Sequence, residues 1–401
     1  MNKTMNEKKI LFTVSGGDHP GITSALMKII SRSSVPILDM GQSVTYGLLS
    51  LSFVLLIQDT ELEDKDDHVI KDLLFQCHKM GLKLSYKILS PEDDKHASYG
   101  EKFILNCVST EPITSHFVRD VASLLADRNI NIHRIDRVSP KDFSSLEILT
   151  TVPKSIDWNE TKSELLKIST DHQIDVAFLK DNIFRRSKRL IVFDMDSTLI
   201  QAEVIDEMGK VHGVGEQIAE VTEKAMNGEI DFNEALKERV SKLKGLEVEK
   251  MKEILDTLPL TPGVEEFIAT IKSLGYKVAV ISGGFSFFAN ALKDKLGLDY
   301  AFANELKIID GKLTGELEGT IVNAEQKAML TKLIAQQEGI NMEQVVAIGD
   351  GANDLPMLAA AGLGIAFHAK EIVKKKASQH MSHGPMTSIL YFLGIPGPVV
   401  E

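Results

Sequence analysis

Two aspartates one residue apart stand where an apolar segment runs out into a loop. Asp194 and Asp196 follow the apolar run 190–193 and lead into Ser197 and Thr198. Residues two apart in a strand point the same way, and two buried charges on one side require a cation or a reaction. The pair therefore suits metal-assisted chemistry. In an open α/β sheet, ligands bind at the carboxyl ends of the strands, where this pair would lie.

Polar groups also follow two later apolar runs with the composition of buried strands. The run 277–281 ends in the segment Ser282–Gly284, whose hydroxyl and backbone amides could cradle an anion at a helix start. The run 344–348 leads into Gly349–Asp354, which adds two carboxylates and an amide. Oxygen ligands of this kind suit Mg²⁺.

A lysine lies between these two segments in an unusual place. Asn323 can cap a helix together with Gln326, and Lys327 then falls in the first turn of that helix. The helix dipole favours anions at this end, so a lysine there is unfavourable unless it has an anionic partner. We therefore predict that Lys327 pairs with a carboxylate or a bound anion.

The order of these features resembles the four motifs of the haloacid dehalogenase superfamily of phosphotransferases. The segments that carry the resemblance are Asp194–Thr198, Ser282-Gly283, Lys327 and Gly349–Asp354. Within that superfamily, residues 188–396 resemble the branch that hydrolyses O-phospho-L-serine, because segments 199–203 and 231–240 are similar to its sequences. The resemblance implies an α/β fold with a Rossmann-like parallel sheet and a small helical cap.

The expected chemistry is transfer of a phosphoryl group to a carboxylate and then to water. Once Ser282, Gly283, Lys327 and Mg²⁺ neutralise the charge of the phosphoryl group, attack by Asp194 becomes feasible and an aspartyl-phosphate forms. Asp196 could protonate the departing serine oxygen and then deprotonate the attacking water. One side chain would thus serve both half-reactions.

The resemblance also assigns ligands to the metal and the substrate. It implies that Mg²⁺ is held by Asp194, by the main-chain carbonyl of Asp196 and by Asp350. It further implies that Asn353 contacts the substrate or its phosphate, while Asp354 supports the site from behind.

A folded insert should select the substrate. The stretch between Asp194 and Ser282 far exceeds the dozen or so residues that a crossover connection needs. Residues of about 204–258 read as helical, with Leu236, Val240 and Leu243 spaced by four and three. We therefore expect a small helical cap over the site.

The substrate's ammonium and carboxylate each require an opposite charge. Glu203 suits the ammonium, and the planar fork of Arg239 suits the carboxylate. Phe232 and Met226 are expected in the core of the cap, where either could also line the pocket.

The composition is that of an acidic globular chain. With 401 residues and 43% hydrophobic content, it can bury two or three ordinary cores. The formal net charge of -12 argues against nucleic acid and anionic membrane as partners, since both bind positive patches. The basic cluster at 185–189 is a local exception, and we expect it to be a solvated edge of a linker.

The cysteine content and the apolar runs bear on the compartment. Cys77 and Cys107 are the only cysteines, so no disulfide framework is expected and a reducing compartment fits. The N-terminus lacks a signal-peptide pattern. The longest apolar stretch, about 44–57, is too short and interrupted to span a bilayer. We therefore expect a cytoplasmic protein.

The residues before Lys188 repeat one order of elements, βαββαβ. The first copy comprises strands 9–14, 37–46, 49–58 and 82–89, with helices from the 16–21 turn to about 33 and at 66–80. The second comprises strands 103–108, 132–138, 146–152 and 174–179, with helices 113–128 and 158–170. This internal duplication has the size of two small domains.

Both copies resemble ACT domains, the small-molecule sensing modules of amino-acid metabolism. The resemblance implies two α+β ferredoxin-like domains, at 8–90 and 101–181, joined to the catalytic domain by residues 181–189. The first turn, with Asp18, His19 and Gly21, resembles the ligand turn of that family. Its equivalent in the second copy, 110–113, lacks the glycine, so binding is expected at the first copy.

The ACT resemblance implies an effector and an oligomer. We expect the first turn to bind a small amino acid, with serine, the product, as the effector. Pairing edge to edge would bury exposed strand edges, which favours a homodimer. Alternatively, the repeats serve only for dimerisation. Because the core and all the site residues of the catalytic domain are expected beyond them, removal of residues 1–180 is expected to leave that domain folded.

Two alternative functions are consistent with parts of the sequence. A phosphotransferase that moves the phosphoryl group to an alcohol such as homoserine would share the same motifs. A non-catalytic amino-acid sensor would keep the fold, but loss of Asp194 or Lys327 would mark it, and both are present. The partners expected for the enzyme are a small phosphomonoester and, at the ACT-like domains, serine.

Overall fold

The computed structural model describes residues 7–33, 35–58, 69–90, 93, 100–139, 144–226 and 229–397. The chain divides into two compact units, Met1–Tyr99 and Gly100–Glu401. Pro91, in the segment between the two repeats, and Gly228, in the helical insert, lie outside the described residues, as do the first residues of the helix expected at 66–80. The side chain of Met226 is also outside them.

The first unit is a four-stranded antiparallel sheet with two helices, in the predicted order. Its strands run in the order β2-β3-β1-β4. Alternate residues of β1, Ile10, Phe12 and Val14, are buried against the two helices, because a strand presents every second side chain to one face. The elements are β1 (Glu7–Gly17), α1 (Ile22–Arg32), β2 (Ile37–Thr45), β3 (Leu48–Gln58), α3 (Val69–Lys79) and β4 (Lys83–Ile88).

The second copy has the same topology and belongs to the second unit. Its sheet order is β6-β7-β5-β8, and Phe117, Val121 and Leu125 of its first helix are buried against the strands. The elements are β5 (Glu101–Val108), α4 (Ser115–Asp127), β6 (Asn131–Arg137), β7 (Ser145–Val152), α5 (Trp158–His172) and β8 (Asp175–Lys180). The internal duplication is therefore present in the fold.

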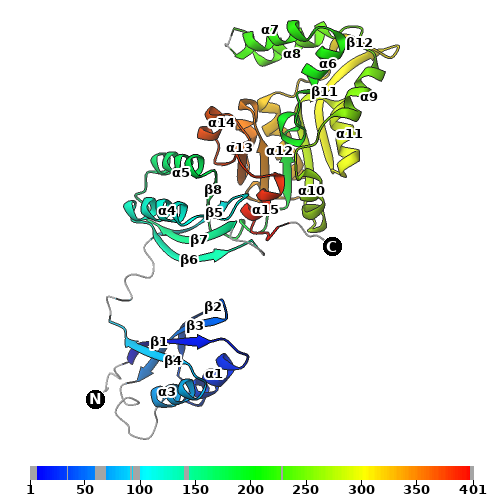
Figure 1. The fold of residues 1–401 in the computed structure, drawn as a ribbon. Helices are drawn as coiled ribbons and strands as arrows, with labels where there is room; N and C mark the ends of the chain where they lie inside the picture. The colour runs from blue at the N-terminus through cyan, green and yellow to red at the C-terminus, as the bar shows by residue number, and fades with distance from the viewer. Residues whose placement is uncertain are drawn as a thin grey trace, which may run out of the picture. The chain divides into compact units, whose positions relative to one another are not determined.

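The rest of the second unit is built on a seven-stranded sheet in the order β12-β11-β10-β9-β13-β14-β15 (Figure 1). All its neighbours are parallel except β11 and β12, which form a hairpin. The strands are β9 (Leu190–Phe193), β10 (Lys277–Phe285), β11 (Tyr300–Ile309), β12 (Lys312–Glu318), β13 (Val345–Gly349), β14 (Leu363–Phe367) and β15 (Gln379–Met381).

Helices cover both faces of this sheet. Leu190 and Val192 of β9 face a core that includes α12 (Ala324–Gln337), whereas Ile191 and Phe193 face the larger core on the other side. A strand buried on both faces reads as an unbroken apolar run, as this one does. The remaining helices of the two layers are α10 (Val264–Ser273), α11 (Ser286–Leu296), α13 (Leu355–Ala360), α14 (Glu371–Lys376) and α15 (Ile389–Phe392).

Four helices follow β9 and form the predicted cap, which is the upper green part of Figure 1. Leu236, Val240 and Leu243 are buried, as their spacing predicts. The β11–β12 hairpin supports the cap, because the backbone of Gly245 donates to Leu313 O at 2.8 Å. The cap helices are α6 (Val204–His212), α7 (Gly215–Met226), α8 (Phe232–Lys242) and α9 (Val248–Thr257).

The basic cluster at 185–189 is the solvated linker edge that we expected only at Arg186 and Arg189, which are exposed. Arg185 is only 3% exposed and makes a bidentate ion pair with the buried Glu147 of β7 at 3.1 and 3.2 Å. Burial of a charged side chain requires such a partner. Lys188 is also buried, and its ammonium donates to Glu343 O. The segment therefore joins the second ACT-like domain to the catalytic domain tightly.

The edge strands of these two domains, β8 and β15, are joined by side chains. The amide of Gln379 donates to Phe178 O at 3.0 Å and accepts from Phe178 N at 2.9 Å, as a neighbouring backbone would. The buried carboxylate of Asp175 accepts three backbone N–H groups, from Ser382 at 2.6 Å, His383 at 3.0 Å and Gly384 at 3.0 Å. We call these contacts the Asp175 clasp.

The expectation that the catalytic core lies wholly beyond residue 180 is wrong. Val108 and Ala177 of the second ACT-like domain belong to the same buried cluster as Ile191 and Phe392. Removal of residues 1–180 would expose this apolar surface and leave the groups held by the clasp without partners. The division of the chain instead falls at residues 99 and 100, so the first unit is the separable part.

We expect Asp175→Ala to loosen the seam between β8 and β15. Three backbone N–H groups would lose a charged acceptor, at a cost of about 3 kcal/mol. The melting temperature should fall, and amide exchange at residues 382–384 should become faster. Asp127→Ala, a change at an exposed aspartate of α4, is the matched control. Unchanged exchange at 382–384 in the Asp175 variant would show that the clasp does not hold this loop.

The structure can be compared with two of the observations from which we predicted the compartment, the apolar runs and the cysteines. Across the described residues, the helices are too short or too polar to cross a lipid bilayer. Cys77 and Cys107 are both buried free thiols.

Candidate active site

The loop after β9 presents the first pair of carboxylates. Asp194 lies at the strand end, where its N–H donates to Ile348 O of β13 at 2.9 Å. Its own Oδ1 accepts the N–H of Met195 at 2.7 Å. Two residues later, Ser197 has φ of 55°, a left-handed conformation that turns the chain away from the strand. The carboxylate of Asp194 is thereby fixed at the carboxyl edge of the sheet.

Lys327 has the anionic partners that its position in the helix predicts. Asn323 caps α12 by accepting Gln326 N at 3.1 Å, which places Lys327 in the first turn. Its ammonium is fully buried, 2.8 Å from Asp194 Oδ1 and 2.7 Å from Asp354 Oδ1. Burial alone would lower the pKa of Lys327, but these two carboxylates hold it above its ordinary value. The lysine is therefore a fixed positive charge beside Asp194.

Asp196 is half-buried next to the end of β10. Its Oδ1 accepts Val204 N at 2.9 Å, and its Oδ2 accepts the hydroxyl of Ser282 at 3.3 Å. Burial, followed by the nearby charge of Glu203, raises the pKa of Asp196 to about 7. A carboxyl group with a pKa near neutrality can both give and take a proton, which suits a general acid and base.

The Ser282–Gly284 segment lies against Asp196. Ser282 is fully buried, and its Oγ accepts Gly284 N at 2.8 Å. A Cβ at Gly284 would lie 2.6 Å from Asp196 Oδ2, so a side chain cannot be placed there. The predicted cradle residues thus lie beside Asp196, at the start of α11.

Three carboxylates at this edge form a cluster that could hold a metal ion. Oxygens of Asp194, Asp350 and Asp354 all lie within 4.8 Å of one another. Burial, and then the charge of Asp354, raises the pKa of Asp350 to about 7, and the same two causes raise the pKa of Asp194. Among the described residues, Lys327 is the one ammonium paired with this cluster. The three carboxylates outnumber it, so the donor set fits a divalent cation that prefers oxygen ligands.

The three members of this cluster are not equivalent. Asp354 uses one oxygen for Lys327 and the other for Gly351 N, at 2.9 Å. Asp350 accepts the hydroxyl of Thr198 at 3.1 Å, and it is less deeply buried than Asp354. Both oxygens of Asp354 are thus committed to protein donors. Its position behind the other two agrees with a supporting part in the site.

The cap brings further predicted residues over this edge. A Cβ built on Gly283 would lie 3.2 Å from the ring of Phe232 and 3.9 Å from Asn353 Nδ2, so these side chains converge there. Glu203 is exposed and accepts the hydroxyl of Ser197 at 2.8 Å. Of the predicted substrate residues, Met226 alone cannot be placed, because its side chain is outside the described part.

Arg239 is the positive charge of this set. It is half-buried on α8, and its one hydrogen bond among the described residues runs from Nε to Ala235 O at 3.4 Å. Burial lowers the pKa of Arg239, while the charges of Asp206, Glu203 and Asp196 act in the opposite direction. The terminal nitrogens of its fork therefore remain available in the described part of the chain.

Family models match the three domains. Residues 188–362 match the haloacid dehalogenase-like hydrolase model, and residues 8–87 and 107–179 match two ACT domain models. A phosphoserine phosphatase of Streptomyces coelicolor is 36% identical over 403 residues, covering 100% of this chain and 95% of the relative. The chain belongs to the phosphoserine phosphatase family. A phosphoserine phosphatase of Mycobacterium tuberculosis is 37% identical over an alignment that covers 98% of this chain and 94% of that relative.

Solved structures support the same family. A probable phosphoserine phosphatase of Vibrio cholerae has a TM-score of 0.60 and 39% identity, covering 73% of this chain and 86% of that one. A haloacid dehalogenase family hydrolase of Salmonella enterica has a TM-score of 0.64 and 31% identity, covering 73% of this chain and 98% of that one. The α/β fold with its ACT domains is therefore confirmed.

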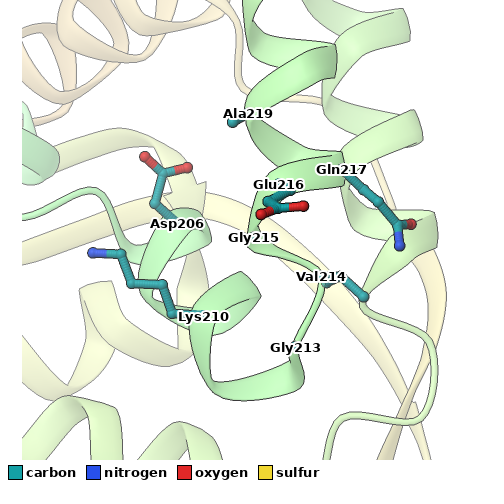
Figure 2. Close-up of a pocket in the computed structure, with 8 residues that line it drawn as sticks. All are labelled: Asp206, Lys210, Gly213, Val214, Gly215, Glu216, Gln217 and Ala219. Atoms are coloured by element: carbon teal, nitrogen blue, oxygen red, sulfur yellow. The ribbon is translucent and has the colours of Figure 1, made fainter.

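The sequence analysis assigned no role to two residues near the site, Thr198 and Asp206. Thr198 donates to Asp350, and its place in the Asp194–Thr198 motif could have indicated a contact across the strand ends. Asp206 lies in α6, and its charge acts on Arg239. Asp206 lines a hollow of about 530 Å³. Figure 2 shows it on α6, facing Glu216 and Ala219 of α7. The hollow belongs to the cap and shares no lining residue with the carboxylate cluster.

Proposed function

We propose that this protein hydrolyses O-phospho-L-serine to L-serine and phosphate through an aspartyl-phosphate on Asp194. The observation that carries the proposal is the buried contact of 2.8 Å between Lys327 Nζ and Asp194 Oδ1. A buried cation beside a strand-end aspartate can neutralise the charge of an incoming phosphoryl group, which otherwise repels a carboxylate. The family of the curated relatives supports the same reaction.

The first half-reaction forms the covalent intermediate. Lys327 and the N–H of Met195 both hold Oδ1 of Asp194, so Oδ2 is the oxygen that we assign to the attack. The bond from Oδ2 to phosphorus forms as the bond from phosphorus to the serine oxygen breaks. Asp196, in its protonated form, gives its proton to that oxygen, and serine leaves as an alcohol.

The second half-reaction releases phosphate. Asp196 is now a carboxylate and takes a proton from a water molecule, whose oxygen attacks phosphorus. The bond between phosphorus and Asp194 breaks, and the aspartate is regenerated. We assign the hydroxyl of Ser282 and the N–H of Gly283 to the phosphoryl oxygens in both steps, which requires that hydroxyl to turn away from Asp196, its acceptor in this structure.

We assign Mg²⁺ to the carboxylate cluster. Asp194, the main-chain carbonyl of Asp196 and Asp350 would hold it, with Asp354 anchoring Lys327 behind them. When bound, Mg²⁺ supplies positive charge that polarises the phosphoryl group. The surplus of carboxylates over ammonium groups supports this assignment.

We expect Asp350→Asn to weaken Mg²⁺ binding by at least about tenfold, because affinity depends on the charge of the ligands. The measurement is the rise in melting temperature as Mg²⁺ is added, which needs no turnover. Asp256→Asn, at an exposed position of the cap, should bind Mg²⁺ as the unaltered protein does. Equal affinity in the Asp350 variant would remove this residue from the metal site.

The cap would select the amino-acid part of the substrate. Arg239 can bind the carboxylate with two parallel N–H groups, and Glu203 can accept from the ammonium. Phe232 lies close to Gly283 and would shield the phosphate from water. Asn353 would contact the phosphate from the opposite loop, and Met226 is retained as a pocket residue only on its position in α7.

The activity is tested by phosphate release from O-phospho-L-serine beside other phosphomonoesters. O-phosphoethanolamine lacks the carboxylate, and glycerol phosphate lacks both charged groups. Adding homoserine as an acceptor separates hydrolysis from transfer to an alcohol, since transfer would form phosphohomoserine in place of free phosphate. A marked preference for O-phospho-L-serine with water as the acceptor is expected. A flat profile across the three esters would exclude the proposed specificity.

The first ACT domain is proposed to bind serine and to mediate homodimerisation. Gly21 has φ of 97° at the start of α1, as a tight turn through Asp18 and His19 requires, and all three residues are exposed. Strand β2 lies at the sheet edge and carries large exposed apolar side chains, namely Ile37, Leu38, Met40 and Val44. A second copy of the chain, paired along this edge, would bury them.

We expect serine to bind the full-length protein at a site distinct from the catalytic one. Calorimetry on the Asp194→Asn variant should detect this binding at millimolar serine. Gly21→Val should abolish it, because a β-branched side chain cannot adopt that positive φ without strain. Lys71→Val, at an exposed position of α3 in the same domain, is the control for general damage. Sedimentation of a Val44→Lys variant tests the dimer, and absence of binding with an intact dimer would leave dimerisation alone.

A further inference from the structure

A cleft lies along the seam between the second ACT domain and the catalytic domain. Its volume is about 310 Å³, and it is formed by α5 and β8 on one side and by α14 and β15 on the other. Gln379, whose amide joins the two edge strands, forms part of its wall. The cleft shares no lining residue with the carboxylate cluster of the active site.

The mouth of this cleft is positively charged in an acidic protein. Lys162 reaches it from α5, and Lys374 and Lys375 reach it from α14, while no carboxylate is among its lining side chains in the described part of the chain. Lys374 has a partner in Glu371 at 3.1 Å. Lys162 and Lys375 are exposed and form no ion pair with any described residue. This gathering contrasts with the chain's net charge of -12.

The interior of the cleft is apolar and hydrogen-bonding. Leu165, Val176 and Phe178 supply buried carbon surface. His380 is 8% exposed, and its ring nitrogen lies 3.4 Å from the hydroxyl of Ser169. Ligand sites for small molecules combine such an apolar lining with a few polar groups, and about 300 Å³ is at the lower end of their range.

We propose that this cleft binds a small organic anion with at least two negative charges. Its charged groups lie against Lys162 and Lys375, and its carbon skeleton lies over Val176 and Phe178. Such a ligand spans α5 and α14 and so contacts both domains. Both phosphorylated acids and polycarboxylates have this chemistry. The site is separate from the first-turn serine site and is independent of the proposed reaction.

The protein carries its own reporter beside the cleft. Trp158 is its only tryptophan and stands next to Asn159, which lines the cleft. Its ring packs on Phe178 with the ring centroids 5.6 Å apart. Occupation of the cleft therefore changes the surroundings of Trp158, and tryptophan fluorescence of the full-length protein measures binding directly.

The experiment titrates the full-length protein with citrate, phosphoglycolate and inorganic phosphate at constant ionic strength. A saturable fluorescence change with citrate or phosphoglycolate is expected at millimolar concentration or below. The probe that binds more tightly shows whether the ligand is a polycarboxylate or a phosphorylated acid. Lys162→Glu/Lys375→Glu should weaken it by at least about tenfold. Lys167→Glu/Lys376→Glu makes the same charge change on the same helices outside the cleft and should bind normally.

Three outcomes would overturn the proposal. One is no saturable change with any of the probes. Another is an equal response to inorganic phosphate, which would show general anion binding without recognition of an organic ligand. The third is equal loss of binding in both double variants, since only the first pair lines the cleft. Circular dichroism of each variant verifies its fold.

Discussion

Replacement of Asp194 by asparagine should reduce turnover of O-phospho-L-serine by at least about a thousandfold. The amide keeps the shape of the side chain and can still receive a hydrogen bond from Lys327, but it cannot attack phosphorus. Phosphate release under saturating substrate is the measurement. Trapping the phosphorylated enzyme by acid quench should label the unaltered protein and not the variant.

This result requires two controls. The introduced asparagine can deamidate back to aspartate, so mass spectrometry must bound the fraction that has done so. Asp294→Asn, at an exposed position of α11, should retain full activity. Activity of the Asp194 variant beyond its deamidated fraction would refute the covalent mechanism. Asp196→Asn should also be severely impaired, because it loses the proton relay.

Arg239→Ala should lower kcat/KM for O-phospho-L-serine by about two to three orders of magnitude. The guanidinium fork is proposed to make two charge-assisted hydrogen bonds to the substrate carboxylate, and their loss costs a few kcal/mol. O-phosphoethanolamine has no carboxylate, so its kcat/KM should scarcely change. The ratio of the two values is therefore the decisive quantity.

A neighbouring lysine provides the comparison. Lys237→Ala removes an exposed positive charge from the same helix, and both substrates should be handled normally. Equal losses on both substrates in the Arg239 variant would place this side chain in the cap structure or at the phosphate. Near-normal rates with O-phospho-L-serine would remove it from the site altogether.

The local patterns of this sequence were sufficient to predict its elements and the residues that gather at the sheet edge. Asn323, the N-cap residue of α12, and Lys327 lie within one helical turn, so the sequence alone shows that Lys327 is at the positive end of the helix dipole. An anionic partner for Lys327 could therefore be predicted. The edge itself follows from parallel strands, whose carboxyl ends all meet on one side. Asp194, Lys327 and Asp354 are in contact for this reason.

The seam between the domains could not be predicted in the same way. Arg185 and Asp175 have no local signal for burial, since each looks like an ordinary charged residue beside a strand. Their partners, Glu147 and the 382–384 backbone, lie far away in the sequence, and only the docked surfaces bring them together. The contact of Thr198 with Asp350 and the effect of Asp206 on Arg239 could not be predicted for the same reason, because each joins residues that are distant in the sequence.

The Asp175 clasp also sets an order of events during synthesis. The chain emerges from its N-terminus, and domains generally fold as they appear. Gln379, which covers Phe178, is made 201 positions later. Until then, the newly folded ACT domain presents β8 as an open strand edge, able to pair with other nascent chains. The last strand of the catalytic sheet, β15, thus covers the open edge of the second ACT domain. Synthesis that stops before β15 would leave both domains incomplete.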